Sequence, residues 1–274
     1  GIHDFMRILE MMPDDFEMVE MGIDDICRSG LVRNYLLAKH ASGQWFMFTQ
    51  CDVYRDKFKH LSQFLIEGVR HYGVDDQIAY PSVTSVISWI NRKKFADWRQ
   101  KVGEEAANKK TKKATTRGTR LHRVFEEYCA NLDYTSLKEW EVPLIQLMFK
   151  AAKKELDKRV TTVYEQETRM CSKRLCLAGT VDLIADFDGE LSIVDFKTSE
   201  KEKPEEWLED YFVQLSAYWA MFSEATGVVP KKLVVFLVAE NGDVQIVERK
   251  NIMNYLTILQ DYVSKFVQHH NALT

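Results

Sequence analysis

The stretch 179–199 constrains the fold of this chain more than any other part of the sequence. Two runs rich in β-branched and aromatic residues, 180–187 and 190–198, flank the pair Asp188-Gly189. Asp-Gly between two such runs is a strong signal for a two-residue turn between antiparallel strands. The stretch is therefore predicted to be a β-hairpin.

The turn also determines which side chains meet. Phe187 faces Glu190 across such a turn, and counting back along both strands places Asp182 opposite Asp195. Facing Cβ atoms of an antiparallel pair lie about 4.5–5.5 Å apart, so two carboxylates there repel each other. A divalent cation would offset this repulsion, because Mg²⁺ prefers carboxylate oxygens. Lys197 points to the same face as Asp195, so two acids and a lysine should converge on one place.

The pattern Asp182, then Asp195-x-Lys197, resembles the catalytic motif of the PD-(D/E)XK nuclease superfamily. The resemblance implies that the two aspartates hold catalytic Mg²⁺, for which Mn²⁺ could substitute. It also implies that Lys197 helps to activate water or stabilises the transition state, and that the Phe196 carbonyl is an extra metal ligand. An Asp-x-Lys pattern alone is common, and the hairpin register is what makes this one specific.

Two motifs on predicted helices extend the resemblance to the RecB-like members of the superfamily. Those nucleases carry a metal-binding histidine on a helix upstream of the paired acids, and His122 stands at that place, with Glu126 on the same helix face as a supporting residue. Gln214 and Tyr218 match a Gln-x-x-x-Tyr motif that positions nucleic acid and the catalytic lysine, and Tyr218 could also stack on a base. Taken singly, each could equally be ordinary helix surface.

The resemblance is sharper for the mitochondrial genome maintenance exonucleases and their phage-encoded relatives. It covers about residues 80–265 and implies an enzyme that cuts single-stranded DNA from its ends and leaves 5′-phosphates. It places Glu167 and Thr198 in supporting positions around the metal and Ser199 in contact with nucleic acid. For Glu167, an exposed strand carboxylate without a role is the alternative interpretation.

Positive charge is concentrated in one segment of an otherwise acidic chain. Residues 92–120 contain eleven Lys and Arg against three acids, a local charge of +8, although the whole chain carries −4. Such asymmetry suits a binding surface for phosphates, whereas the alternative is a solvated helix face with a Lys-rich loop at 109–116. The residues predicted to contact nucleic acid here are Lys109, Lys110, Lys112, Lys113, Arg117 and Arg120.

The order of the predicted elements is typical of an α/β (α+β-like) fold with a mixed central sheet and flanking helices, as the resemblance also implies. We expect an accessory region of unknown role at 1–78, with a strand at 44–49 and a helix at 56–72, and a nuclease domain at 79–274. The elements expected in that domain are helices from about 82 to 98, 117–131, 137–158, 205–224 and 252–268, and strands at 161–170, 180–187, 190–198, 232–239 and 243–248.

Composition excludes several other classes of protein. The five cysteines include no Cys-x-x-Cys pair and none follows Cys176, so no iron–sulfur cluster is expected. No apolar run approaches the length of a membrane span. We expect a cytoplasmic protein, in a bacterial host if it is phage-encoded, that acts on DNA ends and works with replication or recombination proteins. A nuclease for duplex DNA ends and a non-catalytic DNA-end-binding module are the alternatives.

Overall fold

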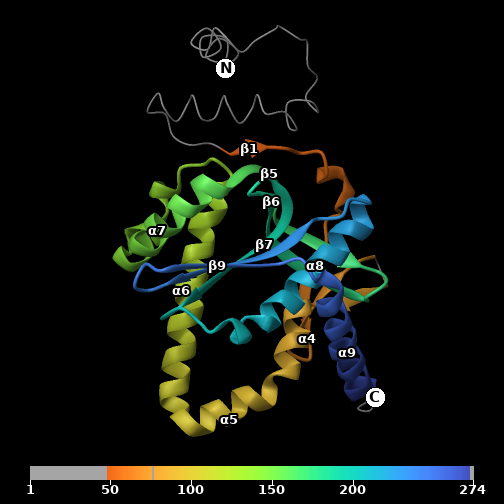
Figure 1. Cartoon of the computed structure of the whole chain (residues 1–274). Helices are drawn as coiled ribbons and strands as arrows, with labels where there is room; N and C mark the ends of the chain where they lie inside the picture. Colours follow the sequence, from red (N-terminus) through yellow and green to blue (C-terminus); the bar gives the residue numbers. More distant parts are fainter. Residues whose placement is uncertain (1–47, 76, 272–274) are drawn as a thin grey trace, which may run out of the picture.

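The computed structural model of the chain describes residues 48–75 and 77–271, which form a six-stranded mixed sheet with helices on both faces (Figure 1). The predicted fold class is confirmed. The strand order is β1-β5-β6-β7-β8-β9; the neighbours β5, β6 and β7 are antiparallel, and β8 runs parallel to β7. The strands are β1 Thr49–Gln50, β5 Val160–Ser172, β6 Leu177–Phe187, β7 Glu190–Ser199, β8 Lys232–Ala239 and β9 Val244–Arg249.

Figure 1 shows helices on both faces of this sheet, and each face packs into its own hydrophobic core. On β7, Ile193 packs toward α4, α8 and α9, whereas Val194 and Phe196 pack toward α6 and α7. This alternation is the period-2 pattern of a strand buried on both faces, and it directs Asp195 and Lys197 to the α8 side. The helices are α4 Val83–Ile90, α5 Arg92–Val102, α6 Glu104–Cys129, α7 Pro143–Arg159, α8 Glu209–Thr226 and α9 Ile252–Asn271.

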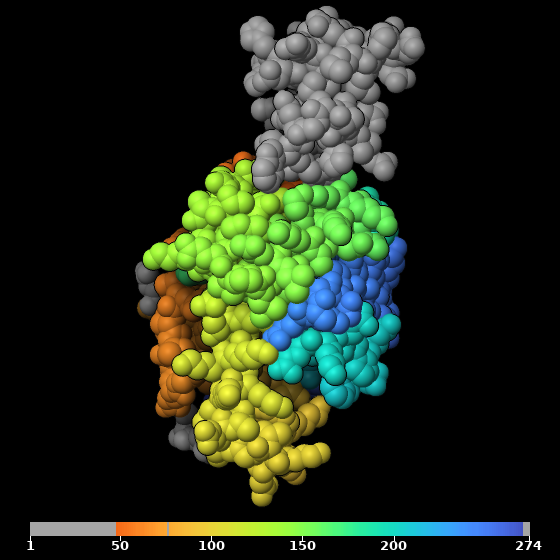
Figure 2. All heavy atoms as spheres, turned by 90° about the vertical axis from the view of Figure 1, so that its left-hand side faces the viewer, coloured from red at the N-terminus to blue at the C-terminus, as the bar shows by residue number. Residues whose placement is uncertain are grey.

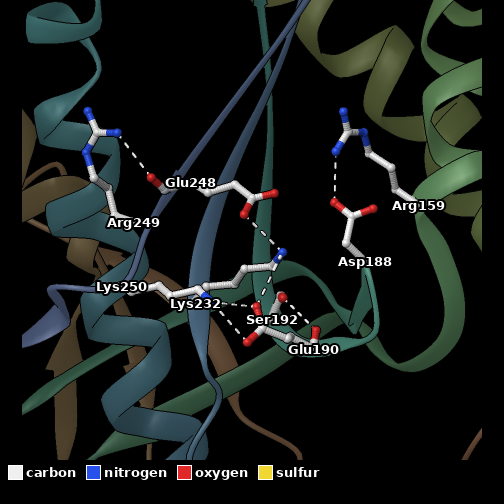
Figure 3. A network of polar contacts seen from close by, with 8 residues as sticks. All are labelled: Arg159, Asp188, Glu190, Ser192, Lys232, Glu248, Arg249 and Lys250. Atoms are coloured by element: carbon white, nitrogen blue, oxygen red, sulfur yellow. Dashed lines mark hydrogen bonds and ion pairs between the residues drawn. The ribbon is translucent and has the colours of Figure 1, made fainter.

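The turn of the central hairpin is fixed by ion pairs to its neighbours (Figure 3). Arg159 at the end of α7 donates to the Asp188 carboxylate at 2.8 Å. Lys232 is 2% exposed and lies 3.0 Å from a Glu248 oxygen and 3.8 Å from a Glu190 oxygen. A buried ammonium needs such partners, because losing them would leave a desolvated charge. These contacts hold the turn in place, at the end of the hairpin that lies away from Asp182 and Asp195.

A second sheet of three strands replaces the helix predicted over 56–72. It consists of β2 Ser62–Ile66, β3 Val69–Gly73 and β4 Ala79–Pro81, in that order. The prediction was wrong because the apolar residues in this stretch fit a helical period as well as a strand. The Glu67-Gly68 turn decides between them: both residues have positive φ (49° and 79°), which suits a two-residue hairpin turn and breaks a helix.

The loop predicted at 109–116 is instead part of one continuous helix, α6. This segment contains only Lys, Thr and Ala, with no Pro or Gly, so nothing in its composition stops a helix. Farther back, the predicted helix around residues 82–98 is two helices, α4 and α5, which meet at Asn91. Figure 1 shows α5 and the first half of α6 projecting from the body of the protein, whereas α4 packs beside α9.

The described residues on the N-terminal side of the predicted boundary at 78 pack with the rest of the chain. β1 extends the main sheet by pairing with β5, and β3 pairs with β4 across the boundary itself. The predicted strand at 44–49 lies outside the described residues except for its end, where β1 begins at Thr49. Among the helices that the structure describes, none is long and apolar enough to span a membrane.

Candidate active site

The central hairpin has the predicted turn and register. Asp188 and Gly189 both have positive φ (51° and 77°), and the β6–β7 ladder runs from the predicted turn as far as Leu183 opposite Val194. The predicted rung of Asp182 with Asp195 would come next, but the ladder ends one residue earlier.

The strands part at this point because a side chain takes over the next backbone donor. The N–H of Phe196, which the following rung would use, donates instead to Asp182 Oδ2 at 2.8 Å. Asp182 and Asp195 therefore lie on neighbouring strands just where these strands separate. This opening leaves room for a ligand between the two carboxylates.

A buried polar network holds Asp195 and Lys197 against α8. Lys197 Nζ lies 2.6 Å from Asp195 Oδ2, and Asp195 is 1% exposed. Gln214 Nε2 donates to Asp195 Oδ1 at 3.3 Å and to the Tyr218 hydroxyl at 3.0 Å, and Gln214 Oε1 accepts from Lys197 Nζ at 3.4 Å. The Gln-x-x-x-Tyr motif thus orients the predicted catalytic lysine.

Tyr218 does not present a face to a nucleobase, contrary to the stacking role considered for it. It is 2% exposed and packs in the core under α8. Its hydroxyl joins the polar network by accepting a hydrogen bond from Gln214. The sequence pattern could not show this, because an i, i+4 pair has the same spacing whether its face is buried or exposed.

A second cluster forms beside this network from His122, Glu167 and Asp182. One potential ligand atom from each of these residues lies within 4.8 Å of the other two. His122 Nε2 donates to the Phe196 carbonyl at 2.8 Å, and Nδ1 faces Asp182 Oδ2 at 3.7 Å. The Phe196 carbonyl thus fixes the imidazole, in the way that second partners commonly orient metal-binding histidines. The role of the Phe196 carbonyl as a metal ligand stays a prediction.

Glu167, predicted as a supporting residue, is a member of the cluster itself. Its backbone has a φ of 47°, an uncommon conformation for a residue other than glycine. The side chain is exposed at the rim, yet desolvation by the walls of the site, followed by the nearby carboxylates of Asp182, Glu126 and Asp195, raises its pKa to about 8. The ionised form of the Glu167 carboxylate is therefore disfavoured unless a cation lies next to it.

The same logic applies at Asp195. Burial, followed by the nearby Asp182 carboxylate, raises its pKa to about 6, although the attraction of Lys197 lowers it. An imidazole nitrogen and several carboxylate oxygens that repel one another are a donor set for Mg²⁺ or Mn²⁺. The residues present therefore fit a divalent metal ion, with His122, Glu167 and Asp182 as its ligands and Asp195 next to them.

The polar network around Asp195 and the cluster around His122 line one cavity of about 680 Å³. Its other walls carry basic and polar residues that the sequence analysis did not single out, among them Gln63, Arg70, Tyr72, Arg123 and Arg169. The signal for Arg169 was available, because it lies two residues after Glu167 on the same strand and so shares its face. Gln63, Arg70 and Tyr72 were missed because their hairpin was interpreted as a helix.

Three residues that were predicted around the metal and the substrate have structural contacts. Glu126 lines the cavity as predicted and accepts a hydrogen bond from Arg123 at 2.6 Å. Thr198 accepts from Arg117 Nε at 3.1 Å. Ser199 is 5% exposed and donates to the Lys201 carbonyl, and its contact with nucleic acid stays a prediction.

The predicted basic contacts on α6 fall into two groups. Arg117 is 6% exposed and pairs with Glu240 within the protein, and its contact with nucleic acid stays a prediction. Lys113 pairs with the same carboxylate at 2.8 Å but keeps about half of its side chain exposed. The exposed residues of the prediction are Lys109, Lys110, Lys112 and Arg120.

Comparison with known proteins agrees with this geometry. The family model of the PD-(D/E)XK nuclease superfamily matches residues 95–272. Mitochondrial genome maintenance exonuclease 1 of Homo sapiens is 28% identical over 132 residues, which is 45% of this chain and 38% of the human protein. This chain therefore matches well under two thirds of its human relative.

A solved structure is also among the similar proteins. It comes from Eubacterium rectale, its protein is named as a candidate exonuclease, and it has a TM-score of 0.40 at 13% identity over 57% of this chain and 65% of that chain. The family model covers more than half of the present chain, and its range contains His122, Glu167, Asp182, Asp195 and Lys197. This chain belongs to the PD-(D/E)XK nuclease superfamily.

Proposed function

We propose that the protein is a divalent-metal-dependent DNA exonuclease that prefers single-stranded ends and leaves 5′-phosphates. The observation that supports this most is the cluster of His122, Glu167 and Asp182 beside the Asp195–Lys197 pair, in one open cavity. The human relative is named an exonuclease, which favours attack at strand ends. Mg²⁺ is the proposed ion, with Mn²⁺ as a substitute.

In this mechanism, His122, Glu167 and Asp182 hold the ion, and Asp195 completes the site. When bound, the metal supplies a Lewis acid that polarises the scissile phosphate and lowers the pKa of a water molecule. The chain's own part is to place the phosphate and to balance its charge. Asp182 and Asp195 line one cavity, where a phosphate oxygen could approach an ion that their carboxylates would hold.

Lys197 acts in this proposal as a cation and not as a general base. Burial alone would lower its pKa, but Asp195 and Asp182 outweigh burial and raise it. The ammonium therefore stays protonated and can donate to the charge that develops on the phosphate. Gln214 limits its movement by accepting one of its hydrogen bonds.

The basic helices provide the approach for the DNA backbone. Lys109, Lys110 and Lys112 are exposed on the part of α6 that projects from the body, and Arg120 is exposed between Thr119 and His122, which both line the cavity. Figure 2 shows this yellow segment as a projecting end of the molecule. Contacts of this kind to phosphates are independent of sequence and weaken as salt rises. A replication or recombination partner stays a proposal with no contact surface assigned.

The test compares four substrates of one sequence: a linear single strand labelled at its 5′ end, the same strand labelled at its 3′ end, a closed single-stranded circle and a blunt duplex. Each is incubated with Mg²⁺ or Mn²⁺. We expect both linear single strands to be shortened, the circle to be spared, the duplex to be cut much more slowly, and the products to carry 5′-phosphates. Cleavage of the circle would reject an end-dependent enzyme, and equal rates on the duplex would favour the duplex-end alternative.

A further inference from the structure

The β2–β3 hairpin has no part in the proposed chemistry, yet it forms one wall of the catalytic cavity. Gln63, Arg70 and Tyr72 line the same space as Asp182 and Lys197. In Figure 2 the orange strip that contains this hairpin runs alongside the yellow α6, whose residues line the cavity on the other side.

The base of the hairpin is anchored to the main sheet. The Tyr72 hydroxyl lies 3.1 Å from Thr180 Oγ1 on β6, and Tyr72 packs in a small buried cluster with Leu61 and Ala178. Arg169 on β5 donates to the Leu61 carbonyl at 2.6 Å. These contacts fix the orientation of the hairpin relative to the metal-binding cluster.

The register shows which side chains of the hairpin face the cavity. Gln63 pairs with Tyr72, and Leu65 pairs with Arg70. Facing residues of an antiparallel pair project to the same side, as do residues two apart on one strand. Three of these four residues line the cavity, so Leu65 lies on the same face, one step nearer the tip. We call Gln63, Leu65 and Arg70 the hairpin face.

The hairpin face combines an exposed apolar group with a free cation. Leu65 is 70% exposed. Arg70 is exposed, and its guanidinium has no carboxylate partner within residues 48–75 and 77–271, in contrast to Arg117 and Arg123, which are both ion-paired. A nucleotide presents the complementary pair, an apolar base face next to a phosphate.

We infer that the hairpin face binds the nucleotide next to the scissile phosphate, with Arg70 on a backbone phosphate and Leu65 against the face of an unpaired base. This inference rests on the proposed function and deepens it, because bases in a duplex stack on one another and offer no free face to Leu65. The hairpin would thus be one source of the preference for single strands. The continuity of the face with the metal-binding cavity favours a nucleic-acid strand over a protein as its occupant.

The test measures the binding of two labelled single strands of equal length, one intact and one made of abasic sites, which keeps the phosphates and lacks the bases. Binding is measured by fluorescence anisotropy without divalent metal, so that no strand is cut. Leu65→Ser is compared with Ile66→Ser, which also removes an exposed apolar side chain (46% exposed) but from the opposite face of the same strand. Arg70→Gln is compared with Arg174→Gln, at an exposed arginine in the turn between β5 and β6.

We expect Leu65→Ser to weaken binding of the intact strand about fivefold and to leave the abasic strand unchanged, because it removes contact with the base alone. Arg70→Gln should weaken both strands and reduce the slope of log affinity against log salt by about 0.7, as expected for one lost phosphate contact. Both controls should bind like the wild type. Thermal melting of every variant checks that the fold is retained.

The inference is overturned if Leu65→Ser weakens both strands equally, weakens neither, or is matched by Ile66→Ser. It is also overturned if Arg70→Gln and Arg174→Gln have the same effect. These results leave the proposed function standing as long as the wild type degrades linear single strands. A wild type that neither binds nor degrades DNA would overturn the proposed function together with this inference.

Discussion

Glu167 on β5 lies opposite Asp182 on β6, between the rungs Gln166–Leu183 and Thr168–Val181. The β5–β6 register therefore adds a third acid to the pair of aspartates on β6 and β7. With His122 from α6, the ligands come from three neighbouring elements. This placement explains why the pKa of Glu167 is raised by desolvation and by Asp182, and it makes Glu167 the residue on which the metal site is most easily tested.

Replacing Glu167 by Gln should weaken Mn²⁺ binding at least about tenfold, because a charged oxygen ligand is lost from the site. The metal-free variant should be no less stable than the wild type, since one source of carboxylate repulsion has gone. Isothermal titration with Mn²⁺ and melting curves measure the two effects. Glu165→Gln, two residues earlier on the same strand and outside the cluster, serves as the control. Unchanged Mn²⁺ affinity in Glu167→Gln would exclude this residue as a ligand.

The stabilisation that Mg²⁺ gives to the folded protein should increase with pH. In the metal-free protein the pKa values of Asp195 (about 6) and Glu167 (about 8) lie above the values of unfolded chains, about 3.9 and 4.3. Protonation therefore stabilises the folded state at low pH, and this contribution is lost as pH rises through 6 and then 8. The ion needs ionised ligands, so its effect grows over the same range.

Melting temperatures with and without saturating Mg²⁺ between about pH 5.5 and pH 8.5 measure this effect. We expect the metal-free curve to fall relative to the metal-bound curve across the range. The Glu167→Gln variant should lose the upper part of the pH dependence. A metal-induced shift that is constant with pH would count against the raised pKa values as the cause.

Removing the Tyr218 hydroxyl should slow catalysis without weakening the binding of DNA. In Tyr218→Phe, Gln214 loses the partner at 3.0 Å and holds Lys197 less firmly. We expect kcat to fall about tenfold with little change in KM, since Tyr218 is 2% exposed and its hydroxyl acts through Gln214. Tyr255→Phe, at a buried tyrosine whose hydroxyl donates to Glu209 outside the cavity, is the matched control. A raised KM at unchanged kcat would show instead that Tyr218 contacts the substrate.

A methyl group at Gly179 should disturb the same network by a steric route. A Cβ atom built there would lie 2.7 Å from Tyr218 Cε1, which is closer than packed atoms allow. Gly179→Ala should therefore lower the free energy of unfolding by about 1–3 kcal/mol and reduce kcat. Denaturant melts and initial rates test both effects. Gly189→Ala, in the turn of the central hairpin, is the control: the φ of 77° disfavours alanine there, so stability should fall but kcat should not.

Arg117 should matter for stability and little for salt-dependent binding of DNA. Its guanidinium bridges Thr198 and Glu240, so Arg117→Met should lower the free energy of unfolding by about 2 kcal/mol. Lys110→Met, at an exposed position, should show the reverse pattern, with normal stability and a shallower salt dependence. If Arg117→Met changed the salt dependence as Lys110→Met does, the result would support the predicted contact of Arg117 with a phosphate.

The sequence predicted the central hairpin because its signal is local. Asp188-Gly189 needs positive φ at both positions, and that requirement alone sets the register down to Leu183 and Val194. The end of the ladder at Asp182 was not predictable in this way, because it depends on a side chain that captures the N–H of Phe196. The place of the aspartates followed from the pattern, whereas their geometry required the fold.

Where the structure departs from the sequence predictions or adds to them, local patterns were ambiguous and tertiary contacts decided between the possibilities. The stretch around Phe64 fits a helix or a hairpin, and packing of Tyr72 on β6 favours the hairpin. Arg117 belongs to a basic run at 109–120 whose other members are exposed. It is buried because it pairs with Glu240, more than a hundred residues away in the chain. Glu167 was assigned a supporting role because no sequence pattern brings β5 into register with Asp182.

The central claim is tested most directly by comparing the wild type with Lys197→Ala and with Lys201→Ala. The quantity measured is the rate at which each degrades an end-labelled linear single strand in Mn²⁺. Lys201 is an exposed lysine just beyond the same strand and serves as the control. The account predicts rapid shortening by wild type and Lys201→Ala, none in excess EDTA, and a loss of at least about a hundredfold in Lys197→Ala. Wild-type binding without cleavage under either metal, or full activity in Lys197→Ala, would contradict it.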